Sequence, residues 1–175
     1  MHRLPSKRQI SLWKDDDMQE SVDLSQLPKV LGLLQNYEKI LNELMQLGVS
    51  RTYDAPNGQY AEGLAEQRLN GTRATLSEKS YDLSCEEFGK VQVKARIARG
   101  HGKRGETQLS AFRSFDFCHG LVLIFEPNYT VRSATILRAA DLKAAGRQGT
   151  HVNATIIHAT PELLKLGTDI TSRFQ

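Results

Sequence analysis

The strongest constraint on how this 175-residue chain folds is a period-two alternation of apolar and polar side chains over residues 80–97. Successive side chains of a β-strand point to opposite faces of the sheet, so this alternation is typical of half-buried strands. When Leu83 is placed opposite Val91, a three-residue loop of residues 86–88 remains beside Gly89. Such a loop is a common way to close a hairpin, so the sequence predicts two antiparallel strands here.

The predicted register gathers three polar side chains on one face of the hairpin. Asp82 lies opposite Gln92, and Lys94 follows two residues later, so a carboxylate, a carboxamide and an ammonium group converge. Directly opposite Cβ atoms lie roughly 4.5–5.5 Å apart, close enough for two side chains to share an ion. A slip of one residue would mix the two faces. The apolar side chains expected on the other face are Tyr81, Leu83, Cys85, Val91, Val93, Ala95 and Ile97.

Two helices are predicted before the hairpin. Apolar residues recur at steps of three and four over residues 25–47, and Gly48 follows as a C-cap candidate. This helix packs on the domain core, or it forms a homodimer through a short coiled coil. A second helix is expected over residues 59–69, with Glu62 at the rim of its apolar stripe, where its side chain can lean toward the sheet.

The rest of the chain mixes strands and helices. Residues 121–125 are continuously apolar, which is typical of a central strand, and residues 129–136 alternate again. A short helix is expected over residues 141–147. Thr160, Pro161 and Glu162 mark the start of a last helix that runs to about Leu166, with a capping hydroxyl, proline at the first position and an early acid. The pattern indicates an α/β chain of the α+β kind.

Composition sets the domain organisation and excludes several classes of protein. With 39% hydrophobic and 25% charged residues the chain is not disordered, and without an apolar run of 18 residues it has no membrane span. Residues 1–24 are expected to form a polar tail or arm, without a secretory signal, and residues 25–175 a single domain. Cys85 and Cys118 lie outside any CxxC pair, so zinc binding is not expected. Two lone cysteines fit reduced thiols, so a cytoplasmic location is expected.

The charge of the chain is unevenly distributed. A net charge of +3 permits contact with a polyanion but does not demand it. The glycine-rich segment of residues 96–104 is strongly basic, and it is either a solvated loop or a phosphate-binding segment. The histidines at 101, 119, 151 and 158 lack the spacing of a catalytic triad or metal site, and of these only His101 is expected to touch substrate. The candidate DNA-binding residues are Arg96, Arg99, His101, Lys103, Arg104 and Arg113.

The order of these elements resembles the PD-(D/E)XK superfamily, which has the restriction-endonuclease-like fold. Its motif is an acid on a helix, an acid on one strand and a (D/E/Q)-x-K triplet on the next strand. Glu62, Asp82 and the triplet Gln92-Val93-Lys94 match that order, and the resemblance covers residues 27–138. The chain is also similar to small uncharacterised bacterial proteins that carry this motif. The resemblance implies a central mixed sheet flanked by helices, with an N-terminal helical extension.

The resemblance also implies a reaction, namely Mg²⁺-dependent endonucleolytic hydrolysis of DNA in restriction, repair or defence, with Mn²⁺ as a substitute ion. Asp82 would bridge the metal, and Glu62 would hold it directly or through water. Gln92 and the backbone carbonyl of Val93 would complete its shell. Lys94 would orient the attacking water or stabilise charge on the phosphorane.

Two residues depart from the usual motif. Gln92 stands where Glu or Asp is common, and Tyr81 stands where Pro is common. A carboxamide carries no charge and is a weaker ligand, although nucleases of the Mrr type and some resolvases also have Q-x-K. Three functions therefore stay open: a nuclease, a DNA-binding or assembly module that has lost cleavage, and a structural partner in a larger complex that uses the helix at 25–47.

Overall fold

The computed structural model describes residues 27–75, 77–100, 107–149 and 153–175. The expected tail of residues 1–24 lies outside these ranges. The chain divides into two compact units, residues 1–38 and 39–175, and each is described by itself. Helix α1 (Leu27–Gln46) confirms the expected first helix and begins in the first unit. Gly48 follows with a φ of 70°, and its N–H donates to the carbonyl of Met45, as expected of a C-cap.

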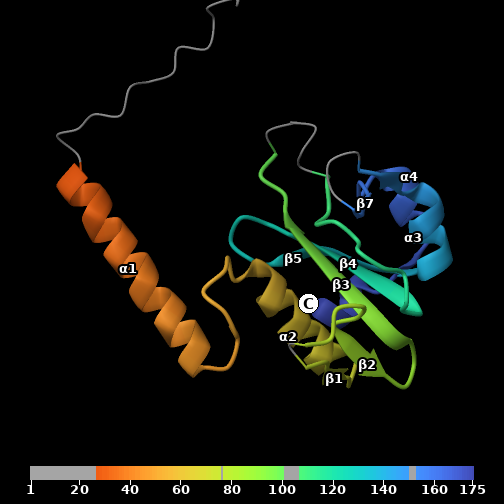
Figure 1. The fold of residues 1–175 in the computed structure, drawn as a ribbon, viewed down its shortest axis with the longest axis horizontal. Coiled ribbons are helices and arrows are strands. Elements are labelled where there is room, and N and C mark those ends of the chain that lie inside the picture. The colour runs from red at the N-terminus through yellow and green to blue at the C-terminus, as the bar shows by residue number, and fades with distance from the viewer. Residues whose placement is uncertain (1–26, 76, 101–106, 150–152) are drawn as a thin grey trace, which may run out of the picture. The chain divides into compact units, whose positions relative to one another are not determined.

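The second unit is built on a six-stranded mixed sheet in the order β1-β2-β3-β4-β5-β8 (Figure 1). Its strands are β1 (Thr72–Arg73), β2 (Leu83–Cys85), β3 (Gly89–Ile97), β4 (His119–Phe125), β5 (Val131–Arg138) and β8 (Thr168–Asp169). Strands β3 and β4 are parallel, and the other neighbours are antiparallel. Parallel neighbours need a long crossover connection, and residues 98–118 provide it. A separate two-stranded ribbon pairs β6 (Arg147–Gln148) with β7 (Thr155–Ile156).

Helices cover both faces of the sheet. Helix α2 (Asn57–Arg68) and the terminal turn η3 (Thr171–Phe174) lie on one side, while α3 (Ala139–Ala145) and α4 (Pro161–Leu164) lie on the other (Figure 1). No helix among the described residues is long and apolar enough to cross a membrane. The arrangement is the expected mixed sheet flanked by helices.

Strand β4 is the centre of the core, and its continuous apolar sequence follows from burial on both faces. Leu121, Leu123 and Phe125 pack in the cluster beneath α2. Val122 belongs to a second cluster with α3 and α4, against which Ile124 packs. The residues of β4 therefore alternate between two cores, which confirms the prediction of a central strand.

The predicted hairpin register is confirmed for its three regular pairs, in which Leu83 lies opposite Val91, residue 84 opposite 90, and Cys85 opposite Gly89. Gly89 adopts a φ of 66°, a conformation that glycine takes at little cost. The first strand is shorter than expected, because residues 80–82 lie outside the ladder. The chain bends at Asp82, whose carbonyl accepts from the N–H of Ala74 and so stays paired on the β1 side.

This bend overturns one detail of the predicted faces. Tyr81 was expected beside Leu83 and Val91, but it packs against the opposite core with α3 and α4. Alternation of side chains holds only while the backbone stays extended, so a bend at Asp82 moves the preceding residue to the other face.

Other boundaries differ for local reasons. Strand β5 begins at Val131 rather than at residue 129, because Tyr129 has a φ of 65° and belongs to a turn. Helix α3 covers residues 139–145 rather than 141–147, since the chain enters β6 at Arg147. Helix α4 begins at its expected cap, where Thr160 Oγ1 accepts from the N–H of Leu163, but it ends at residue 164.

The hairpin turn predicts opposite effects for two glycine substitutions. Gly89→Ala places a side chain at positive φ, where a Cβ would meet Cys118 Sγ at 3.0 Å. We expect a loss of roughly 1–2 kcal/mol in the free energy of unfolding, measured by urea denaturation. Gly63→Ala, inside α2 with no atom within 4 Å of the new Cβ, is the matched control, and it should stabilise the protein by up to about 1 kcal/mol. Equal effects would contradict the turn assignment.

Candidate metal-binding site

The site begins where strand β2 stops. The β2–β3 ladder stops at the pair of Leu83 with Val91. Beyond this pair the edge of β3 that faces β2 has no strand partner, and Asp82 lies along it. The backbone N–H of Asp82 donates to the carbonyl of Val91 at 2.9 Å, and its Oδ2 accepts from the N–H of Val93 at 2.7 Å. The side-chain amide of Gln92 donates to the same oxygen. The carboxylate of Asp82 thus replaces a strand at the edge of β3.

The carbonyl of Val93 faces the same space. In an extended strand the N–H and C=O of one residue point to the same side, and successive residues alternate. The carbonyl of Lys90 accepts from Cys118, on the β4 side, whereas the carbonyl of Val91 accepts from Asp82, on the β2 side. By that alternation the backbone oxygen of Val93 lies on the β2 side, beside Asp82.

Glu62 reaches the site from the first part of α2. Ala61 and Ala65 of this helix are fully buried against the sheet, which fixes the helix, and the side chain of Glu62 is 17% exposed. Arg51 donates to Glu62 Oε2 from its Nη2 at 2.7 Å. Glu66, one turn later, points away and pairs with Arg73 instead. Of these two acids, only Glu62 is available to the site.

Lys94 approaches from the third position of the triplet. Its Nζ lies 3.4 Å from the carbonyl oxygen of Ala111 and 4.8 Å from the centre of the Phe112 ring. Phe112 is buried, as expected of a core aromatic residue, so it provides a fixed surface for the ammonium group. The crossover segment therefore holds the lysine beside the two acids.

A single cavity of about 620 Å³ collects these groups. Side chains from α2, β3 and the crossover segment line it, together with the residue that precedes β2. The predicted site residues in its lining are Glu62, Asp82, Gln92, Val93, Lys94 and Arg96. The structure therefore brings together all four residues expected to carry chemistry and the backbone carbonyl expected to help them.

Burial shifts the acid–base properties of all three charged groups. Burial raises the pKa of Asp82, while the N–H of Val93 and the charge of Lys94 oppose that rise. Burial also raises the pKa of Glu62, and the negative charge of Asp82 adds to it, against the opposing effect of Arg51. Burial lowers the pKa of Lys94, and the two acids oppose this change. Mutual electrostatic effects of this kind require the three groups to lie close together.

These donors fit a hard divalent cation. Mg²⁺ prefers carboxylate, carbonyl and water oxygens, and the cavity offers two carboxylates, a backbone carbonyl and a carboxamide oxygen. The raised pKa of Asp82 and of Glu62 marks negative charge that is poorly solvated, which a bound cation would stabilise. Among the described residues no group of three or more His, Cys, Asp or Glu side chains is placed to hold a metal ion, so the candidate site has two carboxylates and depends on other oxygen donors.

The expected DNA-binding residues fall into three groups. Arg96 lines the cavity, and Arg113 is close enough to Lys94 to lower its pKa. Arg99 is exposed after the end of β3. His101, Lys103 and Arg104 lie outside the described residues. Arg96 and Arg113 are thus the two candidates placed at the site.

Two contributions to the site were not predicted. Arg51, in a segment that reads as a loop, reaches both Glu62 and the carbonyl of Ala74. Residues 108–111 of the crossover and Ile156 of β7 also line the cavity. No periodic pattern in the sequence identifies these residues as part of the site, because only tertiary folding brings them there.

No protein family matches this chain, and no curated protein matches it in sequence.

The raised pKa of Asp82 predicts how stability depends on pH. A carboxyl whose pKa is higher in the folded state stabilises the fold below its unfolded pKa, about 4, and that contribution is lost as the pH rises through the folded pKa. Asp82→Asn removes the buried charge, so the variant should unfold at higher urea than the wild type at pH 8. The difference should narrow as the pH approaches 4.

Asp169→Asn gives a control of opposite sign. Hydrogen bonds from Thr171 lower the pKa of Asp169, so this carboxylate stabilises the protein above its unfolded pKa. Its replacement should lower the urea midpoint at pH 8, with the difference closing as the pH falls. If both variants shifted in the same direction, the buried charge at Asp82 would not be the cause.

Proposed function

We propose that this chain is a metal-dependent nuclease of the PD-(D/E)XK type that hydrolyses DNA phosphodiester bonds with Mg²⁺. The observation that carries the proposal is the convergence of Glu62, Asp82, the Val93 carbonyl and Lys94 in one cavity. The order of these residues along the chain matches the superfamily motif, and their positions at the end of a shortened strand supply oxygen donors and an ammonium group together.

The residues divide the chemistry between them. A cation held by Asp82 and Glu62, with the Val93 carbonyl, would polarise the scissile phosphate and favour ionisation of a bound water. Lys94, resting on the Phe112 ring, can donate hydrogen bonds to the attacking water or to a phosphate oxygen. Because burial lowers the pKa of Lys94, its ammonium releases a proton more readily than that of an exposed lysine.

Arg96 and Arg113 support a polyanionic substrate. Arg96 lines the cavity, and Arg113 acts electrostatically on Lys94 from the crossover segment. Guanidinium groups bind phosphate oxygens in paired hydrogen bonds, which position a nucleic-acid backbone without reading its sequence. A net charge of +3 agrees with this role.

A second function is favoured by one contact. The ion pair between Arg51 and Glu62, at 2.7 Å, gives a site acid a partner without a cation, and Gln92 donates to Asp82 in the same way. A DNA-binding module that has lost cleavage would keep these contacts. Metal binding therefore separates the two functions.

Substitutions of two lysines on strand β3 test the nuclease proposal. Lys94→Ala should lower Mg²⁺-dependent nicking of plasmid DNA by roughly 100-fold or more, because the variant loses a group that acts on the phosphate or water. Lys90→Ala is the matched control, because Lys90 lies on the same face of β3 but contacts Tyr81 and does not line the cavity. Equal nicking by the wild type and Lys94→Ala would assign the activity to a contaminant.

Metal affinity provides a further prediction. Isothermal titration with Mn²⁺ should show binding to the wild type, loss of it in Asp82→Asn, and tighter binding in Gln92→Glu. A third carboxylate at position 92 adds a charge next to Asp82, which is expected to raise affinity by roughly tenfold. Glu66→Gln is the control, because Glu66 pairs with Arg73 outside the cavity. A wild type without Mn²⁺ binding would favour the inactive module.

A further inference from the structure

A second cavity lies beside the β6–β7 ribbon. In the segment that follows the ribbon, Ile157 and Ala159 are buried in the core that includes α3 and α4. Ile156, His158 and Thr160, which alternate with them, line the cavity, and the N–H of Thr160 donates to the carbonyl of His158 in a tight turn. Arg147 lies directly opposite Ile156 in the ribbon, so its side chain joins the same face.

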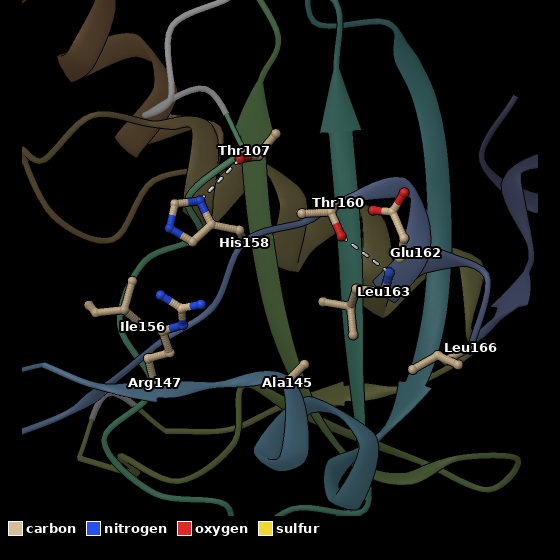
Figure 2. Close-up of a pocket in the computed structure, with 9 residues that line it drawn as sticks. All are labelled: Thr107, Ala145, Arg147, Ile156, His158, Thr160, Glu162, Leu163 and Leu166. Atoms are coloured by element: carbon tan, nitrogen blue, oxygen red, sulfur yellow. Dashed lines mark hydrogen bonds between the residues drawn. The ribbon is translucent and has the colours of Figure 1, made fainter.

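These residues line a cavity of about 650 Å³. Figure 2 shows Arg147, Ile156 and His158 along one side of it and Glu162 with Leu166 on the other. Such a volume is within the range of small-molecule sites, about 300–1,000 Å³. Nothing in the proposed chemistry at Asp82 uses this space.

The cavity holds planar, polar and apolar groups together. The ring of His158 is fixed by a 3.1 Å hydrogen bond between its Nδ1 and Thr107 Oγ1. The guanidinium of Arg147 forms no ion pair with any described residue and is exposed. Imidazole and guanidinium planes both stack on nucleic-acid bases, and the guanidinium also binds phosphate.

The remaining lining suits the edge and underside of a base. Leu163 and Ile156 offer apolar surface, and the carboxylate of Glu162 can accept from an amino group. Thr160 Oγ1 caps α4, where it accepts from the N–H of Leu163, and hydrogen bonds from its own backbone N–H and from the Thr160 hydroxyl lower the pKa of Glu162. One apolar surface, two stacking planes and a few polar groups fit a single unpaired nucleotide.

Ile156 connects this cavity with the candidate metal site, because it belongs to the lining of both. The two cavities therefore adjoin at one residue. A strand whose phosphate is at Asp82 can place a neighbouring nucleotide at His158, provided that this nucleotide is not paired in a duplex. Paired bases stack within the helix and cannot enter a pocket without being extruded.

We propose that the second cavity binds one unpaired nucleotide of the DNA strand that is cut at the metal site, so that the substrate carries a single-stranded segment. This inference rests on the proposed nuclease function. The chemistry is that of a nucleotide from either source, a DNA strand or a free mononucleotide, and the effect of a substitution in the cavity on the binding of each separates the two.

Binding can be measured in EDTA, where cleavage does not interfere, by fluorescence anisotropy of a labelled single-stranded oligonucleotide. We expect Arg147→Ala to weaken binding by about tenfold, which corresponds to the loss of one stacked or phosphate-bound nucleotide. Lys143→Ala, which removes the same charge from neighbouring α3 outside the cavity, should change binding by less than about twofold. Binding to a blunt duplex of the same sequence should be equally weak for both variants and the wild type.

An abasic scan tests the site without relying on one variant. Removing the base at one position of the oligonucleotide should weaken binding to the wild type, and that dependence should vanish in Arg147→Ala. Binding of dAMP that Arg147→Ala abolishes, with the oligonucleotide bound equally well by the variant and the wild type, would overturn the strand proposal in favour of a free nucleotide. An abasic profile without any sensitive position, in a protein that still nicks DNA, would overturn the inference and leave the nuclease proposal standing. Position-dependent binding by a protein that does not nick DNA would overturn the nuclease proposal and leave nucleotide binding in the second cavity standing.

Discussion

The site depends on the early end of strand β2. Had the ladder continued past Leu83, strand backbone groups would satisfy the N–H and C=O of Val93, and no oxygen donor would face outward. Because the chain bends at Asp82 instead, a carboxylate takes the place of the missing strand and accepts the N–H of Val93 at 2.7 Å. One backbone irregularity thus places the carboxylate of Asp82 and leaves the edge of β3 beside it unpaired.

This arrangement carries an energetic cost that a purely structural role would not require. Burial raises the pKa of Asp82 and of Glu62 and lowers that of Lys94, so each group is held in surroundings that disfavour its charged form. A carboxylate needed only to satisfy the N–H of Val93 could be replaced by a neutral amide at lower cost. Groups with shifted pKa values that gather in one cavity are typical of sites that bind or transform a ligand.

The sequence predicted the hairpin well because alternation and turn chemistry agree there. Leu83, Val91 and Gly89 allow one register, and Gln92 and Lys94 follow from it. The prediction for Tyr81 was wrong, since alternation cannot reveal a bend in the backbone at Asp82, which moves Tyr81 to the other core. Two-residue strands such as β1 and β8 are too short to carry a periodic signal.

Arg51 shows a different limit of sequence reasoning. Its segment has no regular pattern, and its role follows from contacts with Glu62 and Ala74 that only the folded chain establishes. In the absence of a cation, the guanidinium of Arg51 lowers the free-energy cost of burying the charged carboxylate of Glu62. A bound metal would compete for the same oxygen, so the position of Arg51 couples metal binding to the loop before α2.

The parallel pairing of β3 with β4 accounts for the position of both cavities. Parallel strands require a crossover, and its described part, residues 107–118, contacts the polar face of β3 at Lys94 before the chain enters β4. Leu109 donates to the carbonyl of Ile157 at 2.9 Å, and the carbonyl of Thr107 accepts from Ala159 at 2.7 Å. These bonds tie residues 107–109 to the segment after β7, next to both the candidate metal site and the His158 cavity. A connection that the sheet topology requires thereby borders both cavities. A nucleic-acid strand bound in one cavity would therefore lie next to the other.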